Sequence, residues 1–164
     1  MRTSRHDLAS TLTSTIPAPG SNSGSFEIIN YESGKCLGTS AGHDDADAVQ
    51  WTCNGAPNQQ WHWGGSFEGF TQLINGNDGG NSQCLGIAGG ATNQGADAVG
   101  WTCNGLQNQF WLPSVTGGTD CPGFVEFQNL GSLYFLGVAG NSTNNGANVV
   151  QWHNQDTCNN QLWY

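Results

Sequence analysis

Short runs that alternate hydrophobic and polar residues recur along the chain, and each is bounded by Gly, Asn or Asp. The runs that begin at Phe26, Phe70 and Phe124 read FEIIN, FTQLIN and FVEFQN, and each ends in Asn. No stretch keeps a 3.6-residue hydrophobic period, whereas short period-two runs of this kind are typical of strands. The pattern predicts an all-β protein.

The same succession of segments occurs three times. The first run is followed by KCLGTS, QCLGIA or YFLGVA, then by a polar loop, then by AVQWTC, AVGWTC or VVQWHN, and finally by a Gln-x-Trp element. We therefore predict three copies, over about residues 26–67, 68–116 and 120–164, with about four strands each. One copy alone cannot bury its hydrophobic face or pair its strand edges. The three copies must close together into a barrel of about twelve strands.

The first 25 residues differ from the rest in composition. They are rich in Ser, Thr and Pro and contain no run of seven or more apolar residues, so they resemble neither a signal peptide nor a membrane span. The composition is that of a disordered linker, which places one folded domain over residues 26–164. We expect this domain to be attached to, or associated with, a larger secreted protein; export by an unrecognised route is the alternative.

The charge of the chain excludes two classes of partner. The formal net charge is −9, and beyond residue 25 Lys35 is the only Lys or Arg. Nucleic-acid binding depends on cations that meet phosphates, and one lysine cannot supply them. We therefore expect neither nucleic acid nor an anionic membrane as a partner, and no membrane insertion. The acidic excess has solubility as its simplest explanation.

The six cysteines suggest three disulfides. Cys36 and Cys53 flank the loop of copy 1, and Cys84 and Cys103 flank the same loop of copy 2. Copy 3 has Phe135 and Asn154 at these positions, which leaves Cys121 and Cys158 as the third pair. Loss of both partners together is expected for a disulfide and not for independent thiols. No zinc-type spacing is present, so we predict no metal, no cofactor and an extracellular location.

The Gln-x-Trp elements carry a resemblance to a known family. They are Gln59-Gln60-Trp61, Gln109-Phe110-Trp111 and Gln161-Leu162-Trp163, at intervals of 50 and 52 residues. With Cys-Leu at the second segment and Trp-x-Cys at the third, residues 26–164 resemble the ricin B-type lectins, also described as family-13 carbohydrate-binding modules. The resemblance implies a pseudo-threefold β-trefoil in which Trp61, Trp111 and Trp163 belong to the core.

The resemblance also implies a set of sugar-binding residues. An exposed aromatic ring faces the sugar in this family, and the matching residues here are Trp51, Trp101 and Trp152. A pyranose needs a flat aromatic face together with groups that donate and accept hydrogen bonds. The amides before each core tryptophan could provide the latter: Asn58 and Gln59, Asn108 and Gln109, and Asn160 and Gln161. The alternative for the Gln residues is that they satisfy loop backbone groups.

Two family ligands are missing from every copy. The family's sugar-binding Asp after Cys-Leu is replaced by Gly38, Gly86 and Gly137, and a family Gln is replaced by Val49, Val99 and Val150. These changes indicate weaker or differently shaped recognition. Asp47 and Asp97, and the loop acids Asp44 and Asp45, are candidate substitutes; the alternative is that they are solvated loop acids. Copy 3, with His153 after Trp152, is the copy we expect to bind least.

The sequence favours a non-catalytic module that binds a glycan or polysaccharide through up to three weak surface sites. A glycosidase needs two carboxylates held across a cleft, and three shallow repeats imply none. The four histidines share no repeat position, so we expect no catalytic residues. The main alternative is a β-trefoil that binds another protein, because unrelated functions share this fold. A purely structural spacer would instead bury Trp51, Trp101 and Trp152.

Overall fold

A computed structural model describes residues 14–21, 24–77, 80–115, 121–155 and 157–164. These residues form an all-β structure in which ten strands join one sheet. The strands are β1 (Cys36–Thr39), β2 (Ala46–Trp51), β3 (Trp61–Phe67), β4 (Phe70–Asn75), β5 (Gln83–Ile87), β6 (Ala98–Thr102), β7 (Trp111–Val115), β8 (Val125–Asn129), β9 (Phe135–Val138) and β10 (Val149–Trp152). The 3₁₀ turns are η1 (Pro57–Gln59), η2 (Ala88–Gly90), η3 (Gln107–Gln109) and η4 (Ala139–Asn141). Within these residues, no helix has the length and hydrophobicity needed to cross a bilayer.

The strand count differs from the expected twelve for a local reason. Copy 2 contributes four full strands, β4 to β7, whereas the first run of copy 1 and the last of copy 3 pair only through isolated bridges. Phe26 bridges Trp61, and Asn30 bridges Trp163. The first run of copy 1 and the last run of copy 3 are therefore paired, but each pairing is too short for the run to count as a strand.

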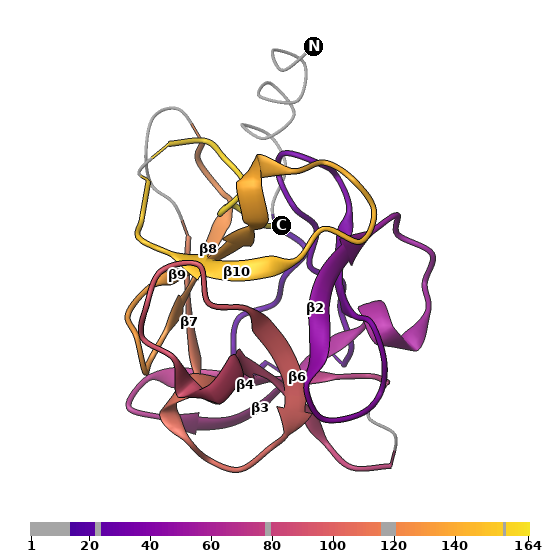
Figure 1. The fold of residues 1–164 in the computed structure, drawn as a ribbon, viewed down its shortest axis with the longest axis vertical. Helices are drawn as coiled ribbons and strands as arrows, with labels where there is room; N and C mark the ends of the chain where they lie inside the picture. The colour runs from indigo at the N-terminus through magenta and orange to yellow at the C-terminus, as the bar shows by residue number, and fades with distance from the viewer. Residues whose placement is uncertain (1–13, 22–23, 78–79, 116–120, 156) are drawn as a thin grey trace.

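Three equivalent strands surround the pseudo-threefold axis at one end of the barrel. Figure 1 looks onto this end, where β2, β6 and β10 frame a triangle. Strand β2 pairs antiparallel with β6, and isolated bridges join Val49 to Asn148 and Asp97 to Val150. Each of the three strands also pairs with its hairpin partner, β1, β5 or β9. The threefold architecture expected from the repeats is thus present.

The Gln-x-Trp tryptophans form the centre of the hydrophobic core. Trp61, Trp111 and Trp163 are each 0% exposed. Each indole N–H donates to a backbone carbonyl of its own copy, so burial leaves no polar atom unpaired. The bonds run from Trp61 to Leu37 (2.9 Å), from Trp111 to Leu85 (2.9 Å) and from Trp163 to Leu136 (3.1 Å). The prediction that these rings belong to the core is confirmed.

The Asn that ends each first run connects neighbouring copies. Its buried side-chain amide donates to the backbone carbonyl of the Asn in the preceding copy's Gln-x-Trp turn. The bonds run from Asn75 to Asn58 (2.9 Å), from Asn129 to Asn108 (2.9 Å) and from Asn30 to Asn160 (2.8 Å). Each copy is thereby hydrogen-bonded to the copy before it, and copy 1 is hydrogen-bonded to copy 3, which closes the ring.

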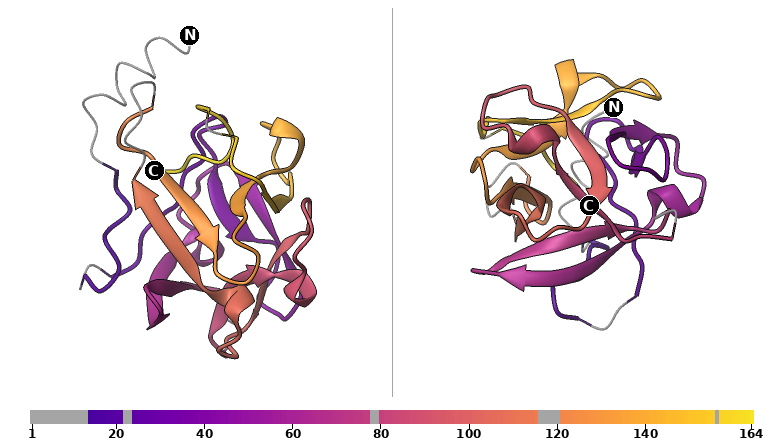
Figure 2. Two further views of the ribbon diagram at one scale, coloured as in Figure 1. Left: turned by 90° about the vertical axis from the view of Figure 1, so that its left-hand side faces the viewer. Right: turned by 60° about the horizontal axis from the view of Figure 1, so that its bottom comes forward.

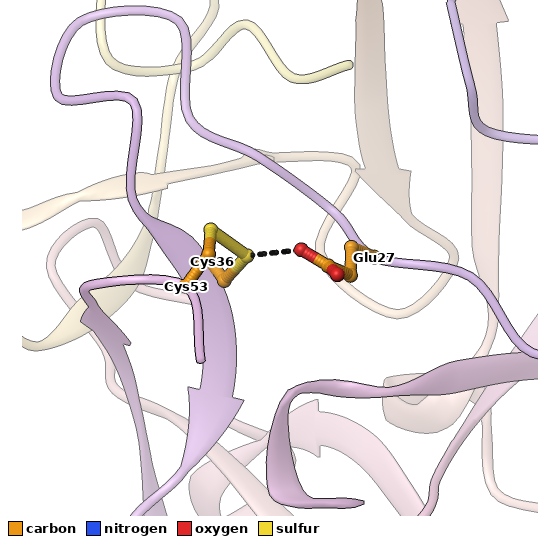
Figure 3. Close-up of side chains that lie close together, drawn as sticks. All are labelled: Glu27, Cys36 and Cys53. Atoms are coloured by element: carbon orange, nitrogen blue, oxygen red, sulfur yellow. Dashed lines mark hydrogen bonds between the residues drawn. A yellow bond between two sulfur atoms is a disulfide. The ribbon is translucent and has the colours of Figure 1, made fainter. Parts of the chain in front are cut away.

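All six cysteines are paired as expected, in the disulfides Cys36–Cys53, Cys84–Cys103 and Cys121–Cys158. The Oε2 atom of Glu27 lies 2.9 Å from Sγ of Cys36. Figure 3 shows this carboxylate beside the Cys36–Cys53 disulfide. Both sulfurs belong to a disulfide and carry no thiolate charge, so this group is not a metal site. In copy 3 the amide of Asn154, which replaces Cys53, donates to Glu126 at 3.3 Å.

Part of the Ser- and Thr-rich N-terminal segment contacts the barrel. Ile16 packs against the hydrophobic core, and the indole N–H of Trp63 donates to the carbonyl of Pro17 at 2.9 Å. Trp63 lies on β3, which forms a long hairpin with β4 along one side of the molecule (Figure 2). Ile16 and Pro17 thus contact the domain, although they belong to the stretch whose composition predicts a linker. Residues 1–13 and 22–23 of that prediction lie outside the described residues.

Candidate functional site

One large aromatic side chain is exposed at the same place in each copy. Trp51 ends β2, Trp152 ends β10, and Trp101 is the penultimate residue of β6. Their side chains are 47%, 37% and 41% exposed, respectively. A structural spacer would have buried them, so this exposure is the feature that a binding function predicts. The threefold relation of the strands places one such ring on each copy.

A loop of the preceding copy holds the residue that follows each exposed tryptophan. Thr52 donates through N (2.8 Å) and Oγ1 (3.1 Å) to Oδ1 of Asn145. Thr102 donates in the same way to Oδ1 of Asp44, at 2.6 and 2.8 Å. His153 contacts Oε1 of Gln94 through its backbone N and Nδ1. The strand end that carries each ring is thus held by two copies and not by one.

Buried glutamines hydrogen-bond the backbone of two of these loops. Gln50 is 0% exposed, and its amide donates to the carbonyls of Ser142 (2.8 Å) and Asn144 (3.0 Å) in copy 3. Gln151 makes the equivalent bonds to Ala91 (3.0 Å) and Asn93 (2.9 Å) in copy 2. Copy 2 itself has Gly100 at this position, so the loop of copy 1 lacks this support.

Two of the exposed tryptophans border surface pockets. The pocket of copy 3 has a volume of about 320 Å³ and is lined by Gly137, Val150, Trp152 and Asn160, together with Gly95 from the loop of copy 2. The pocket of copy 2, at about 260 Å³, has the corresponding lining of Gly86, Val99, Trp101 and Asn108. Copy 3, which we expected to bind least, therefore has a pocket of similar composition.

The two amides before each core tryptophan have different environments. Asn58 and Asn108 are half-buried, and each donates from Nδ2, to the carbonyls of Thr39 and Ile87 respectively, both at 2.9 Å. Asn160 is 8% exposed and donates to Val138 at 2.7 Å and to Asn141. The amide oxygens of Asn58 and Asn108 have no protein partner within the described part of the chain. They can accept a hydrogen bond from a ligand.

The Gln residues are interior groups that shape the loop. Gln59, Gln109 and Gln161 are at most 2% exposed. In copy 1, Gln59 accepts from the N–H of Asn54 (2.9 Å) and donates to the carbonyl of Thr52 (3.0 Å). Copy 2 repeats both bonds around Gln109. These side chains therefore satisfy loop backbone groups, which was the alternative reading, and they position the turn that carries the neighbouring Asn.

The geometry gives a physical reason for the missing family Asp. A Cβ atom at Gly38 would lie 2.8 Å from the carbonyl oxygen of Asn58, and one at Gly86 would lie 2.9 Å from Cγ of Gln109. At Gly137, Cγ of Gln161 would be 2.9 Å away. The Asn-Gln turn thus packs directly on the glycine and leaves no room for an acidic side chain. Val99 and Val150 line the pockets where the family Gln was expected.

The candidate acids lie at the borders between copies. Asp47 and Asp97 are exposed and do not line either of these pockets. Asp44 accepts from Thr102 and, at 3.1 Å, from Nε2 of Gln83. The N–H of Thr102 contributes most to lowering the pKa of the Asp44 carboxyl below its ordinary value. Asp44 is therefore a structural acid, and its pairing with Thr102 could not be seen in the sequence because the two are 58 residues apart.

Comparisons with known proteins agree with this fold. The family model described as ricin-type beta-trefoil lectin domain-like matches residues 15–81 and 66–152. The designed threefold-symmetric protein ThreeFoil is 28% identical, with a TM-score of 0.76 over 85% of this chain and 95% of that one. The Macrolepiota procera ricin B-like lectin, solved in complex with lactose, is 17% identical, with a TM-score of 0.70 over 91% and 96%.

Another similar structure is that of an enzyme, and this chain matches only part of it. An exo-β-1,3-galactanase from Clostridium thermocellum is 24% identical, with a TM-score of 0.78 over 89% of this chain. The match covers only 30% of the galactanase chain. Among curated protein sequences, none matches this chain.

Proposed function

From the premise that the chain belongs to the ricin-type β-trefoil lectin domain-like family, we propose that it is a non-catalytic carbohydrate-binding module. The observation that carries the proposal is the presence of three equivalent, exposed tryptophans, Trp51, Trp101 and Trp152. An exposed indole face beside amide groups suits the apolar face and the hydroxyl edge of a pyranose. The lectin from Macrolepiota procera, which shares the fold, was solved with lactose.

The proposed roles follow the environment of each residue. The rings of Trp51, Trp101 and Trp152 stack on the sugar, and Asn58, Asn108 and Asn160 hydrogen-bond its hydroxyls. The turns that carry these Asn residues are positioned by Gln59, Gln109 and Gln161. Asp47 and Asp97 act at the rim, on an extended glycan. Three disulfides support an extracellular setting.

Several weak sites can give useful affinity together. A site with millimolar affinity contributes only about 4 kcal/mol of binding free energy. Engagement of two or three sites by one polymer raises avidity by about a hundredfold when the spacing fits. A repetitive polysaccharide or a dense glycan surface is therefore the ligand that best suits three related sites on one small domain.

The proposal is tested by glycan-array binding and by pull-down on insoluble polysaccharides. The wild type is compared with the triple variant Trp51→Ala/Trp101→Ala/Trp152→Ala, whose removed rings are exposed and whose fold is checked by circular dichroism. We expect the triple variant to lose binding. Binding that survives it would show that the sites are wrongly assigned. Capture of a protein partner with no glycan bound would favour the protein-interaction alternative.

A further inference from the structure

In two of the three copies, a loop glycine lies beside the exposed tryptophan of the next copy, and one residue of the third loop is equivalent to it. The side chains of Asn145, Asp44 and Gln94 accept bonds from the residues after the tryptophans, and the position of interest is the next one along each loop. Its backbone N–H donates to the carbonyl of the residue that precedes the tryptophan. The three bonds run from Gly146 to Gln50 (2.8 Å), from Gly95 to Gln151 (2.9 Å) and from Asp45 to Gly100 (3.0 Å). All three residues have a positive φ, of 84°, 84° and 67° in that order. They are structurally equivalent.

A side chain at this position faces the indole. A Cβ atom added at Gly146 would lie 3.5 Å from Cζ3 of Trp51, and one added at Gly95 would lie 3.4 Å from Cζ3 of Trp152. The equivalent residue beside Trp101 is Asp45, the only one of the three that has a side chain. Equivalence with Gly146 and Gly95 puts the carboxylate of Asp45 on the side of Trp101, beyond the residues that line the copy 2 pocket itself. The two counterparts have no side chain there.

The neighbouring contacts fix this loop and leave Asp45 available. Asp44 is held by Thr102 and by the 4%-exposed side chain of Gln83. The exposed side chain of Asp45 has no hydrogen-bond partner within the described part of the chain. An Asp in the left-handed region is less favourable than the glycine used twice elsewhere. The fold does not use this carboxylate, although its backbone is held in place.

We propose that Asp45 of copy 1 completes the sugar site of copy 2, where its carboxylate accepts hydrogen bonds from hydroxyls of a neutral saccharide stacked on Trp101. The inference rests on the proposed function and adds a specificity determinant to it. The pocket around Trp101 has no acid in its own lining, and the close packing at Gly86 excludes one there. A carboxylate can bind two adjacent hydroxyls and repels an acidic sugar. Copy 2 thus differs from copies 1 and 3 in ligand preference.

The test uses proteins that keep one tryptophan each. The variant Trp51→Ala/Trp152→Ala retains only the copy 2 site, and Asp45→Gly, Asp45→Asn or the control Glu68→Gly is added to it. Glu68 is an exposed acid with φ 52° in the β3–β4 turn, so Glu68→Gly makes the same chemical and backbone change elsewhere. Each protein is probed on an array of neutral and acidic glycans, and titrated with the neutral glycan that binds best.

We expect Asp45→Gly and Asp45→Asn to weaken neutral-glycan binding by about tenfold, and Glu68→Gly to leave it unchanged. Because Asp45→Gly restores the residue found in the other two loops, the loss cannot be attributed to misfolding. Unchanged binding of both Asp45 variants would overturn the inference but not the proposed function. Stronger binding of acidic than of neutral glycans would overturn it as well. Failure of the copy 2 protein to bind any glycan would refute the proposed function at this site, and the inference with it.

Discussion

Replacement of Gln50 by Ala tests whether the contacts between copies stabilise the whole barrel. Gln50 is fully buried, and its amide makes three bonds: two to carbonyls of the copy 3 loop and one, at 2.7 Å, from the hydroxyl of Ser33. A hydrogen bond of this kind contributes about 1 kcal/mol net. Gln50→Ala should therefore lower the free energy of unfolding by about 3 kcal/mol.

The expected loss is large enough to measure in two ways. For a protein of this size, about 3 kcal/mol corresponds to a fall in Tm of roughly 6–12 °C. Urea unfolding followed by tryptophan fluorescence should show the same loss with an unchanged m value. Gln151→Ala removes the equivalent bonds from the copy 2 loop and should cost a similar amount. A loss below about 1 kcal/mol in both variants would show that water replaces these bonds at little cost and would refute the reasoning.

Three further predictions concern other features of the structure. Gly86→Ala places a Cβ atom 2.9 Å from Cγ of Gln109; it should destabilise by about 1–3 kcal/mol in thermal unfolding and weaken the copy 2 site selectively. Because the pKa of Asp44 is lowered in the fold, its stabilisation is present above the ordinary value of 3.8 and is lost as pH falls below it. The Tm difference between wild type and Asp44→Asn should therefore shrink below this pH, and a constant difference would contradict the assignment. Cys84→Ser/Cys103→Ser opens a loop with a sequence separation of 19 and should cost about 3 kcal/mol in urea unfolding under oxidising conditions; no change would mean that the bridge does not constrain the unfolded chain.

Much of the fold could be predicted because the same residue types recur at equivalent positions in the three copies. The resemblance to the ricin B-type lectins, carried by the three Gln-x-Trp elements, assigned Trp61, Trp111 and Trp163 to the core and Trp51, Trp101 and Trp152 to the surface. The joint loss of two cysteines in copy 3 indicated the disulfides. A single copy would have supported none of these predictions, because short strands have weak individual patterns.

The contacts between copies could not be predicted from the sequence. Asn30, Asn75 and Asn129 were recognisable as the ends of strands, but their partners are backbone carbonyls, which any residue carries. The sequence also could not decide whether the Gln residues of the Gln-x-Trp elements bind a ligand or support the loop, because the answer depends on their burial. The missing Asp could be noted from Gly38, Gly86 and Gly137, whereas the close packing that excludes it depends on distances.

The bond from Asn30 to Asn160 spans 130 residues and closes the ring of copies. Because the last copy must be held by the first, a nascent chain cannot complete the barrel until the residues of copy 3 have left the ribosome. Folding of the domain should therefore be slow compared with a helical domain of equal length. Excision of one copy would break two junctions at once, so the natural unit for truncation or recombination is the complete set of three.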